Sequence, residues 1–217
     1  MLGLDDPQLA QGRRAAVELH NRARLPDYLI SDALEVVRQI YSTSGVDLIW
    51  FHAGRQPSSL AVDDVKIRII ILSKDAANSI AYPLDAVGFT PLADGRHGRL
   101  AYILGHRVSD VSRGYHVQPA IVLAAAIAHE IGHMLLSRSH TSTGLMRAEF
   151  NQSDFRRIAA GELEFTNIEA AVIRRSFPQS GRRPDAVQLL SQGDDTLTQR
   201  ENRALSAGGL AKPRPTE

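Results

Sequence analysis

The most constraining feature of the sequence is an apolar run, 119–128, that leads directly into His129-Glu130-Ile131-Gly132-His133. The run contains no glycine, and Pro119 suits the first position of a helix. Because the run is apolar on every side, we expect a helix that is buried in the core. Histidines four residues apart project from one face of a helix, so His129 and His133 can bind one metal ion together.

The residues around this pair have the chemistry of a zinc site. Glu130 follows the first histidine on a slightly rotated face, where a carboxylate can act as general base on a water molecule. A catalytic zinc usually has three protein ligands, and the nearest third candidate is His140. The chain has no cysteine, so histidines and carboxylates must hold any zinc here. We therefore expect one Zn²⁺ on His129, His133 and His140, with Glu130 as the catalytic base.

Two other interpretations of these residues stay open. The histidines could be hydrogen-bonded core residues and Glu130 a surface charge, although such a helix is costly to bury without a metal or partners. A downstream glutamate, Glu149 or Glu169, could replace His140 as third ligand. The sequence 166–169 has the spacing of a capping box, which gives Glu169 a different role at the start of a helix.

From these residues onward the chain resembles the metzincin clan of zinc peptidases, whose pattern is H-E-x-x-H-x-x-G-x-x-H followed by a methionine-containing turn. Leu136 stands in place of the clan's glycine and Ser139 in place of its third histidine. The resemblance implies that His140 takes that role through a turn that is one residue longer. The segment Gly144-Leu145-Met146 resembles the clan's Met-turn, which implies that Met146 lies beneath the metal as a structural residue.

The resemblance covers roughly residues 15–177 and extends to the segment around Trp50 and to Val87-Gly88-Phe89. Over these residues the chain is similar to a group of bacterial metzincin-like proteins. It implies an α+β fold with a mixed, mostly parallel, twisted sheet of about four or five strands, a buried active-site helix and C-terminal helices. We expect an N-terminal extension over 1–14, a catalytic domain over 15–178, and a disordered tail over 179–217, which is poor in large apolar residues.

Pattern reading of the rest of the chain predicts the elements of this domain. We expect strands over 15–21, 46–52, 65–73 and 100–106, and helices over 26–44, 151–160 and 166–177. In the third strand, alternate residues from Val65 to Ile71 share one face, and the strand is expected to be central. The stretch 74–98 is rich in glycine and proline and could shape a cleft. By resemblance, 100–106 would be the antiparallel edge strand that pairs with a peptide substrate.

Charge and hydropathy limit the classes of partner. The net charge is +1 and the basic residues are scattered, which predicts no nucleic-acid partner. No apolar run reaches the length of a membrane span, which predicts no membrane partner. The chain begins without a basic region followed by an apolar core, so we expect a cytoplasmic protein if the chain is complete and an exported one if a signal peptide was removed. A monomer is expected.

The expected function is hydrolysis of a peptide bond in a peptide or protein substrate by a zinc-dependent endopeptidase, with Glu130 moving the proton. Two alternatives remain: a non-catalytic binding module stabilised by zinc, and a regulatory peptidase specific for one intracellular partner. Four histidines, at positions 20, 52, 97 and 106, are expected to have ordinary surface or hydrogen-bonding roles. His116, with Tyr115, could approach the site as a group that supports the ligands or the oxyanion.

Overall fold

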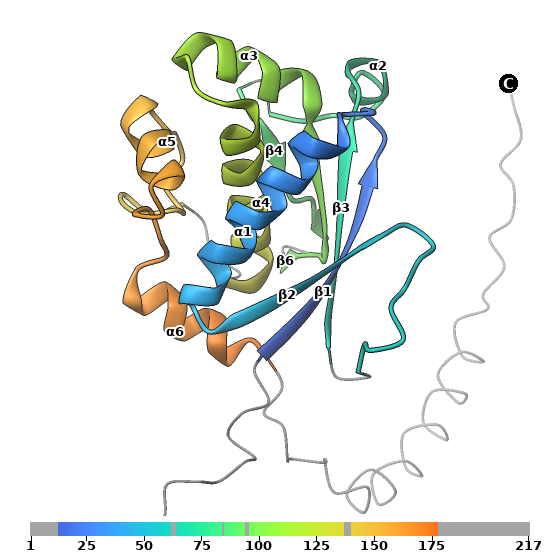
Figure 1. Ribbon diagram of the computed structural model, residues 1–217, viewed down its shortest axis with the longest axis vertical. Helices are drawn as coiled ribbons and strands as arrows, with labels where there is room; N and C mark the ends of the chain where they lie inside the picture. Colours follow the sequence, from blue (N-terminus) through green and yellow to red (C-terminus); the bar gives the residue numbers. More distant parts are fainter. Residues whose placement is uncertain (1–12, 62–63, 84, 94–95, 137–139, 178–217) are drawn as a thin grey trace, which may run out of the picture. The chain divides into compact units, whose positions relative to one another are not determined.

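The computed structural model describes residues 13–61, 64–83, 85–93, 96–136 and 140–177 (Figure 1). Within them, the chain forms a five-stranded sheet in the order β2-β1-β3-β7-β4. The strands are β1 (Arg13–Asn21), β2 (Val46–His52), β3 (Val65–Leu72), β7 (Leu100–Leu104) and β4 (Gly88–Phe89). All neighbouring pairs are parallel except β4 and β7. This confirms the predicted mixed, mostly parallel sheet. A separate two-stranded sheet pairs β5 (Leu92–Ala93) with β6 (Arg96–His97).

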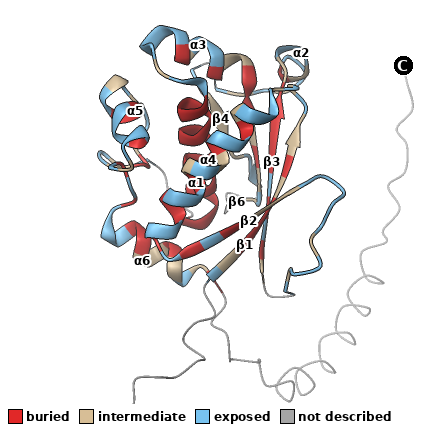
Figure 2. Ribbon diagram, viewed as in Figure 1, coloured by how far each residue is buried: buried red, intermediate tan, exposed pale blue. Residues whose placement is uncertain are grey.

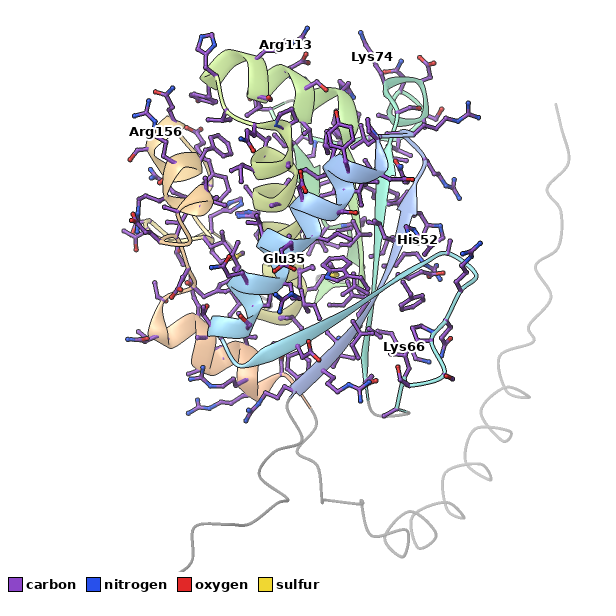
Figure 3. All side chains as sticks on the ribbon, viewed as in Figure 1. Glu35, His52, Lys66, Lys74, Arg113 and Arg156 are labelled. Atoms are coloured by element: carbon purple, nitrogen blue, oxygen red, sulfur yellow. The ribbon has the colours of Figure 1, made fainter. Side chains whose placement is uncertain are left out.

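Helices α1 and α4 pack on one face of the sheet and lie across it in Figure 1. The helices are α1 (Asp27–Thr43), α2 (Lys74–Ala77), α3 (Gly105–Tyr115), α4 (Pro119–Leu136), α5 (Gln152–Ala159) and α6 (Asn167–Arg175). The charged side chains of Arg113 and Arg156, labelled in Figure 3, point outward from α3 and α5. The buried residues of α1, α4 and one face of the sheet belong to the main core.

The central strand β3 shows why the sheet has one face toward the helices. Val65 and its alternate neighbours up to Ile71 are buried in the main core, as the alternation predicts. On the opposite face, Lys66 and Arg68 are exposed, whereas Ile70 and Leu72 are buried. These last two pack in a small second cluster with Ala77 of α2 and Leu104. On this face, β3 is therefore exposed to solvent at its start and buried at its end.

The helix α4 is the centre of the core and the element that carries the motif. It begins at Pro119, as predicted, and all residues from Ala120 to Leu136 are buried (Figure 2). Five alanines in this segment favour the helix and allow neighbours to approach closely. The hydroxyl of Tyr41 in α1 donates a hydrogen bond of 2.8 Å to the carbonyl oxygen of Ala128. This contact fixes α1 on α4 one residue before the motif.

By length and composition, α4 is also apolar enough to cross a membrane, so the prediction that no apolar run reaches this length is wrong. However, 89% of the helix is buried inside the protein. A core helix with this degree of burial meets the same criterion without a membrane.

The segment 100–106 differs from the prediction in two ways. The strand β7 ends at Leu104, and it lies inside the sheet, parallel to β3, so it is not the antiparallel edge. That edge is β4, which pairs antiparallel with β7 through Gly88 and Phe89. The helix α3, which begins at Gly105, was not expected because most of its residues are polar. It is held by a narrow apolar face that includes the buried Val108.

The predicted ends of the other helices are confirmed. Gly45 and Gly161 follow α1 and α5 with φ angles of 75° and 71°, a conformation that favours glycine. Thr166 and Glu169 form the predicted capping box at the start of α6. Residues 13 and 14 of the predicted extension 1–14 belong to β1, whereas residues 1–12 and the predicted tail 179–217 lie outside the described residues.

Candidate metal centre

The three predicted ligands lie together. Nitrogen atoms of His129, His133 and His140 are within 4.8 Å of one another. The ring centroids of the two α4 histidines are 4.6 Å apart, and the His140 ring lies 5.1 Å from His129 and 5.0 Å from His133. Residues 137–139, which connect α4 to His140 and include Ser139, lie outside the described residues. The structure thus brings together residues from a helix and from the loop after it.

The orientation of His129 is set by a backbone carbonyl group. Its Nδ1 lies 2.9 Å from the carbonyl oxygen of Leu145. A carbonyl oxygen only accepts, so Nδ1 carries the proton and Nε2 keeps its lone pair for a metal ion. Burial lowers the pKa of His129 from 6.5 to about 4, against the opposing effect of the Leu145 hydrogen bond. The ring is therefore neutral at neutral pH, as metal binding requires.

The other two ligands differ in exposure. His133 is 8% exposed, like His129, whereas His140 is exposed. The two buried rings come from successive turns of a helix that is packed on all sides. The third ring lies at the solvent side of the cluster.

Met146 packs against α4 at Gly132. It is 1% exposed, and a Cβ atom placed on Gly132 would overlap its Sδ atom. The same Cβ would lie 3.2 Å from the ring of Phe165. Because Gly132 has no side chain, the Met146 side chain occupies the space beside α4 at this position of the motif. The thioether contacts the helix between the turns that carry His129 and His133.

Glu130 is buried beside the edge strand of the sheet. It is 4% exposed, and its Oε2 accepts a hydrogen bond of 2.8 Å from the hydroxyl of Thr90. A Cβ atom on Gly88 of β4 would lie 3.0 Å from Glu130 Cγ and 2.9 Å from Ile103 Cδ1, so glycine lets β4 lie this close. Burial raises the pKa of Glu130 from 4.5 to about 7, and the Thr90 hydrogen bond opposes this rise. Such a carboxyl group can take up and release a proton near neutral pH.

The loop that carries His140 is closed on itself and attached to the helices after it. The backbone N–H of Thr141 donates to the carbonyl oxygen of Met146 at 2.8 Å. Arg147 donates to both carboxylate oxygens of Asp154, at 3.1 and 2.9 Å, and Asp154 is buried in the capping box of α5. The segment from His140 to Arg147 is therefore held at both ends.

The alternative ligands do not join the cluster. Among the residues that the structure describes, the group around these nitrogens contains no carboxylate. Glu149 is exposed, and Glu169 is buried in the capping box of α6. The interpretation of the two α4 histidines as isolated core residues is also disfavoured, because their rings converge on a third. His140 is the third residue that the fold brings to them.

His116 does not contact the histidine cluster. It is exposed and ends α3 with a φ angle of 53°. The ring of Tyr115 packs on Phe155, which contacts Phe150, and Phe150 lies 5.8 Å from the ring of His129. Tyr115 therefore reaches the site only through two other aromatic rings.

The other histidines whose side chains are described are not members of the cluster. His20 is on β1 beside Glu18, His52 is exposed at the end of β2, and His106 lies in the first turn of α3. His97 is on β6, and its side chain is not described. A cavity of about 540 Å³ lies on the other face of the sheet from α4, where Glu18, Lys66, Arg68 and Arg99 line it. None of the three clustered histidines lines it.

Sequence reasoning missed the groups that orient the site. Thr90 carried no signal, because a single hydroxyl residue in an irregular stretch has no distinctive spacing. Gly88 lies in the Val87-Gly88-Phe89 segment of the resemblance, but no sequence pattern indicates its contact with Glu130. The Leu145 carbonyl group could not be identified from side-chain chemistry at all. Each acts through a contact between segments that are distant in the sequence.

Comparisons with known proteins give structural likenesses only. No family model and no curated protein matches the sequence. The fold is similar to the crystal structure of archaemetzincin from Methanopyrus kandleri, with a TM-score of 0.49 and 13% identity over 77% of this chain and 98% of that chain. It is also similar to metalloproteinase-II from Bacteroides fragilis, with a TM-score of 0.43 and 10% identity over 77% of this chain and 54% of that one.

A third likeness is to the solution structure of a protein from Thermotoga maritima, with a TM-score of 0.35 and 14% identity over 77% of this chain and 99% of that chain. Likenesses of this strength do not identify a function.

Proposed function

We propose that the chain is a zinc-dependent endopeptidase of the metzincin type, in which His129, His133 and His140 hold one zinc ion. The observation that carries this proposal is the convergence of three imidazoles, two of them on the helix that also carries the buried carboxyl group of Glu130. Three nitrogens that bind one tetrahedral zinc at about 2.0 Å lie about 3.3 Å from one another. The nitrogens here are within 4.8 Å of one another, and the third ring, His140, is on an exposed residue.

The donor set fits zinc rather than a hard cation. Three imidazole nitrogens suit zinc, whereas calcium and magnesium prefer oxygen ligands. A closed structural zinc site needs a fourth protein ligand, and no carboxylate of the described residues joins the group. The open position favours catalysis over a non-catalytic zinc-stabilised module. A regulatory peptidase with one intracellular partner would use the same site, so that alternative stays a prediction.

When bound, the zinc ion supplies a Lewis acid that polarises a carbonyl group and makes water acidic near neutral pH. Glu130 accepts the proton from the attacking water and then donates it to the leaving amine. Thr90 holds one oxygen of Glu130, which leaves the other oxygen for the water. Leu145 keeps the lone pair of His129 on Nε2.

The substrate we propose is an extended peptide, bound along the edge of the sheet. Among the described strands, β4 forms this edge and pairs only with β7. Its Gly88 lies over Glu130, and Thr90 follows the strand directly. A peptide that adds to this edge through main-chain hydrogen bonds would have its backbone next to the general base.

The substitution Glu130→Gln tests this function. It keeps the shape and the acceptor for Thr90 but removes the base, so we expect hydrolysis of an unfolded protein such as casein to fall at least about 100-fold. Zinc content, measured by atomic emission, should equal that of the unmodified protein. Glu149→Gln, which changes an exposed carboxylate, is the control and should keep full activity. Full activity of Glu130→Gln, or no zinc in the active protein, would refute the proposal.

A further inference from the structure

The carboxylate of Glu169 does more than cap its own helix. It is 6% exposed and accepts three hydrogen bonds. Its Oε2 accepts from the backbone N–H of Thr166 at 2.8 Å and from the hydroxyl of the same residue at 3.0 Å. Its Oε1 accepts from the hydroxyl of Thr141 at 3.2 Å. The capping box requires only Oε2.

The second oxygen connects α6 to the loop of the candidate metal centre. Thr141 is 28 residues earlier in the sequence and directly follows His140. Gly144, with a φ of 76°, lets the loop pass over the carboxylate, and a Cβ placed there would lie 3.7 Å from Glu169 Oε2. The carboxylate therefore lies beneath the loop and contacts the residue next to the exposed ligand.

His140 has few other constraints. The ring of His129 is oriented by the Leu145 carbonyl group, but the described residues form no hydrogen bond with the ring of His140. Its position depends on its backbone, and the backbone is held at Thr141, whose N–H bonds to Met146 and whose hydroxyl reaches Glu169. The hydroxyl also lies 2.8 Å from the Thr143 carbonyl oxygen, within the same loop.

We propose that Glu169 is a positioning residue for the third metal ligand: through Thr141 it holds His140 in place for zinc. This inference rests on the metal site of the proposed function and adds a residue that neither the motif nor the turn contains. Groups that support a metal ligand without binding the metal contribute about 10- to 100-fold to metal affinity. Glu169, considered above as an alternative ligand, thus supports the ligand His140 instead of binding the metal.

The test is the dissociation constant for Zn²⁺ of the full chain, measured by competition with a chelator. We expect Glu169→Ala and Thr141→Val each to raise this constant about 10-fold or more, and Thr141→Ser to restore it. His140→Ala gives the value for complete loss of the third ligand. Thr166→Ala is the matched control, because it weakens the same helix cap but keeps the contact between Glu169 and Thr141. It should lower the melting temperature without changing the zinc affinity.

A double-mutant cycle separates positioning from general loosening. If Glu169 acts through Thr141, the protein with both Glu169→Ala and Thr141→Val should bind zinc no more weakly than Glu169→Ala alone. Additive losses, or unchanged affinity in both single variants, would overturn the inference. So would a loss of affinity in Thr166→Ala equal to that in Glu169→Ala. If His140→Ala weakens zinc binding but Glu169→Ala does not, only this inference fails. If the unmodified protein binds no zinc, the proposed function fails with it.

Discussion

The carbonyl oxygen of Leu145 lies 2.9 Å from Nδ1 of His129, so the loop after α4 orients a candidate ligand within α4. The next residue, Met146, occupies the space beside Gly132 of α4. The loop also carries His140 itself. The site is therefore built from two segments that hold each other, and a change in their packing should act on both.

We expect Gly132→Ala to destabilise the protein. The added methyl group would overlap Met146 Sδ and lie 3.2 Å from the ring of Phe165. Overpacking of this kind costs about 1–3 kcal/mol and alanine in a helix interior gains about 1 kcal/mol, so we expect a net loss of up to about 2 kcal/mol. Urea unfolding of the metal-free protein should show this loss.

Gly114→Ala in α3 is the matched control for this substitution. A Cβ atom at that position has no atom within 4 Å, so only the helix propensity changes. The free energy of unfolding should rise by up to about 1 kcal/mol. If both substitutions stabilise the protein, the close packing of Met146 on the helix is wrong.

The features predicted from the sequence are those that short-range patterns determine. The buried helix from Pro119 follows from an unbroken apolar run, and the pair of α4 histidines follows from helical spacing. The capping box at Thr166 is likewise a local pattern. The placement of β3 at the centre of the sheet follows from its two-sided apolar end.

The features that the sequence did not reveal depend on contacts between distant segments. Thr90 reaches Glu130 over 40 residues, and Glu169 reaches Thr141 over 28. No periodicity encodes either contact. The edge strand β4 has two residues, too few for alternation to be visible, and the resemblance assigns the edge to 100–106 instead.

The hydroxyl of Thr90 gives a second prediction. It donates to Oε2 of Glu130 at 2.8 Å, and a hydrogen bond to a charged group contributes about 1.5–3 kcal/mol. If the peptidase function holds, Thr90→Val should lower kcat/KM about 10- to 100-fold. Zinc affinity should not change, because Thr90 contacts the base and not the histidines.

Thr90→Ser keeps the hydroxyl group and should retain most of the activity. Activity and zinc affinity measured together on both variants distinguish orientation of the base from damage to the metal site. Equal activity of Thr90→Val and the unmodified protein would show that Glu130 needs no such partner.

The raised pKa of Glu130 predicts how the metal-free protein responds to pH. Burial raises this pKa from 4.5 to about 7, so the folded state keeps a proton that the unfolded chain has lost. The folded state binds more protons between these values, and its stability falls as the pH rises from about 4.5 to 7. Glu130→Gln removes this loss and keeps the acceptor for Thr90. The substitution should therefore stabilise the metal-free protein by about 1 kcal/mol at pH 5 and about 3 kcal/mol at pH 8.

Urea unfolding of both proteins at these two pH values, with a chelator present, measures the difference directly. His129, whose pKa is lowered by burial, affects both proteins alike and cancels in the comparison. Glu149→Gln changes an exposed carboxylate and serves as the control. A gain that is equal at both pH values would mean that Glu130 does not hold its proton in the folded state. In that case the carboxylate would lie in a more polar environment than its 4% exposure implies.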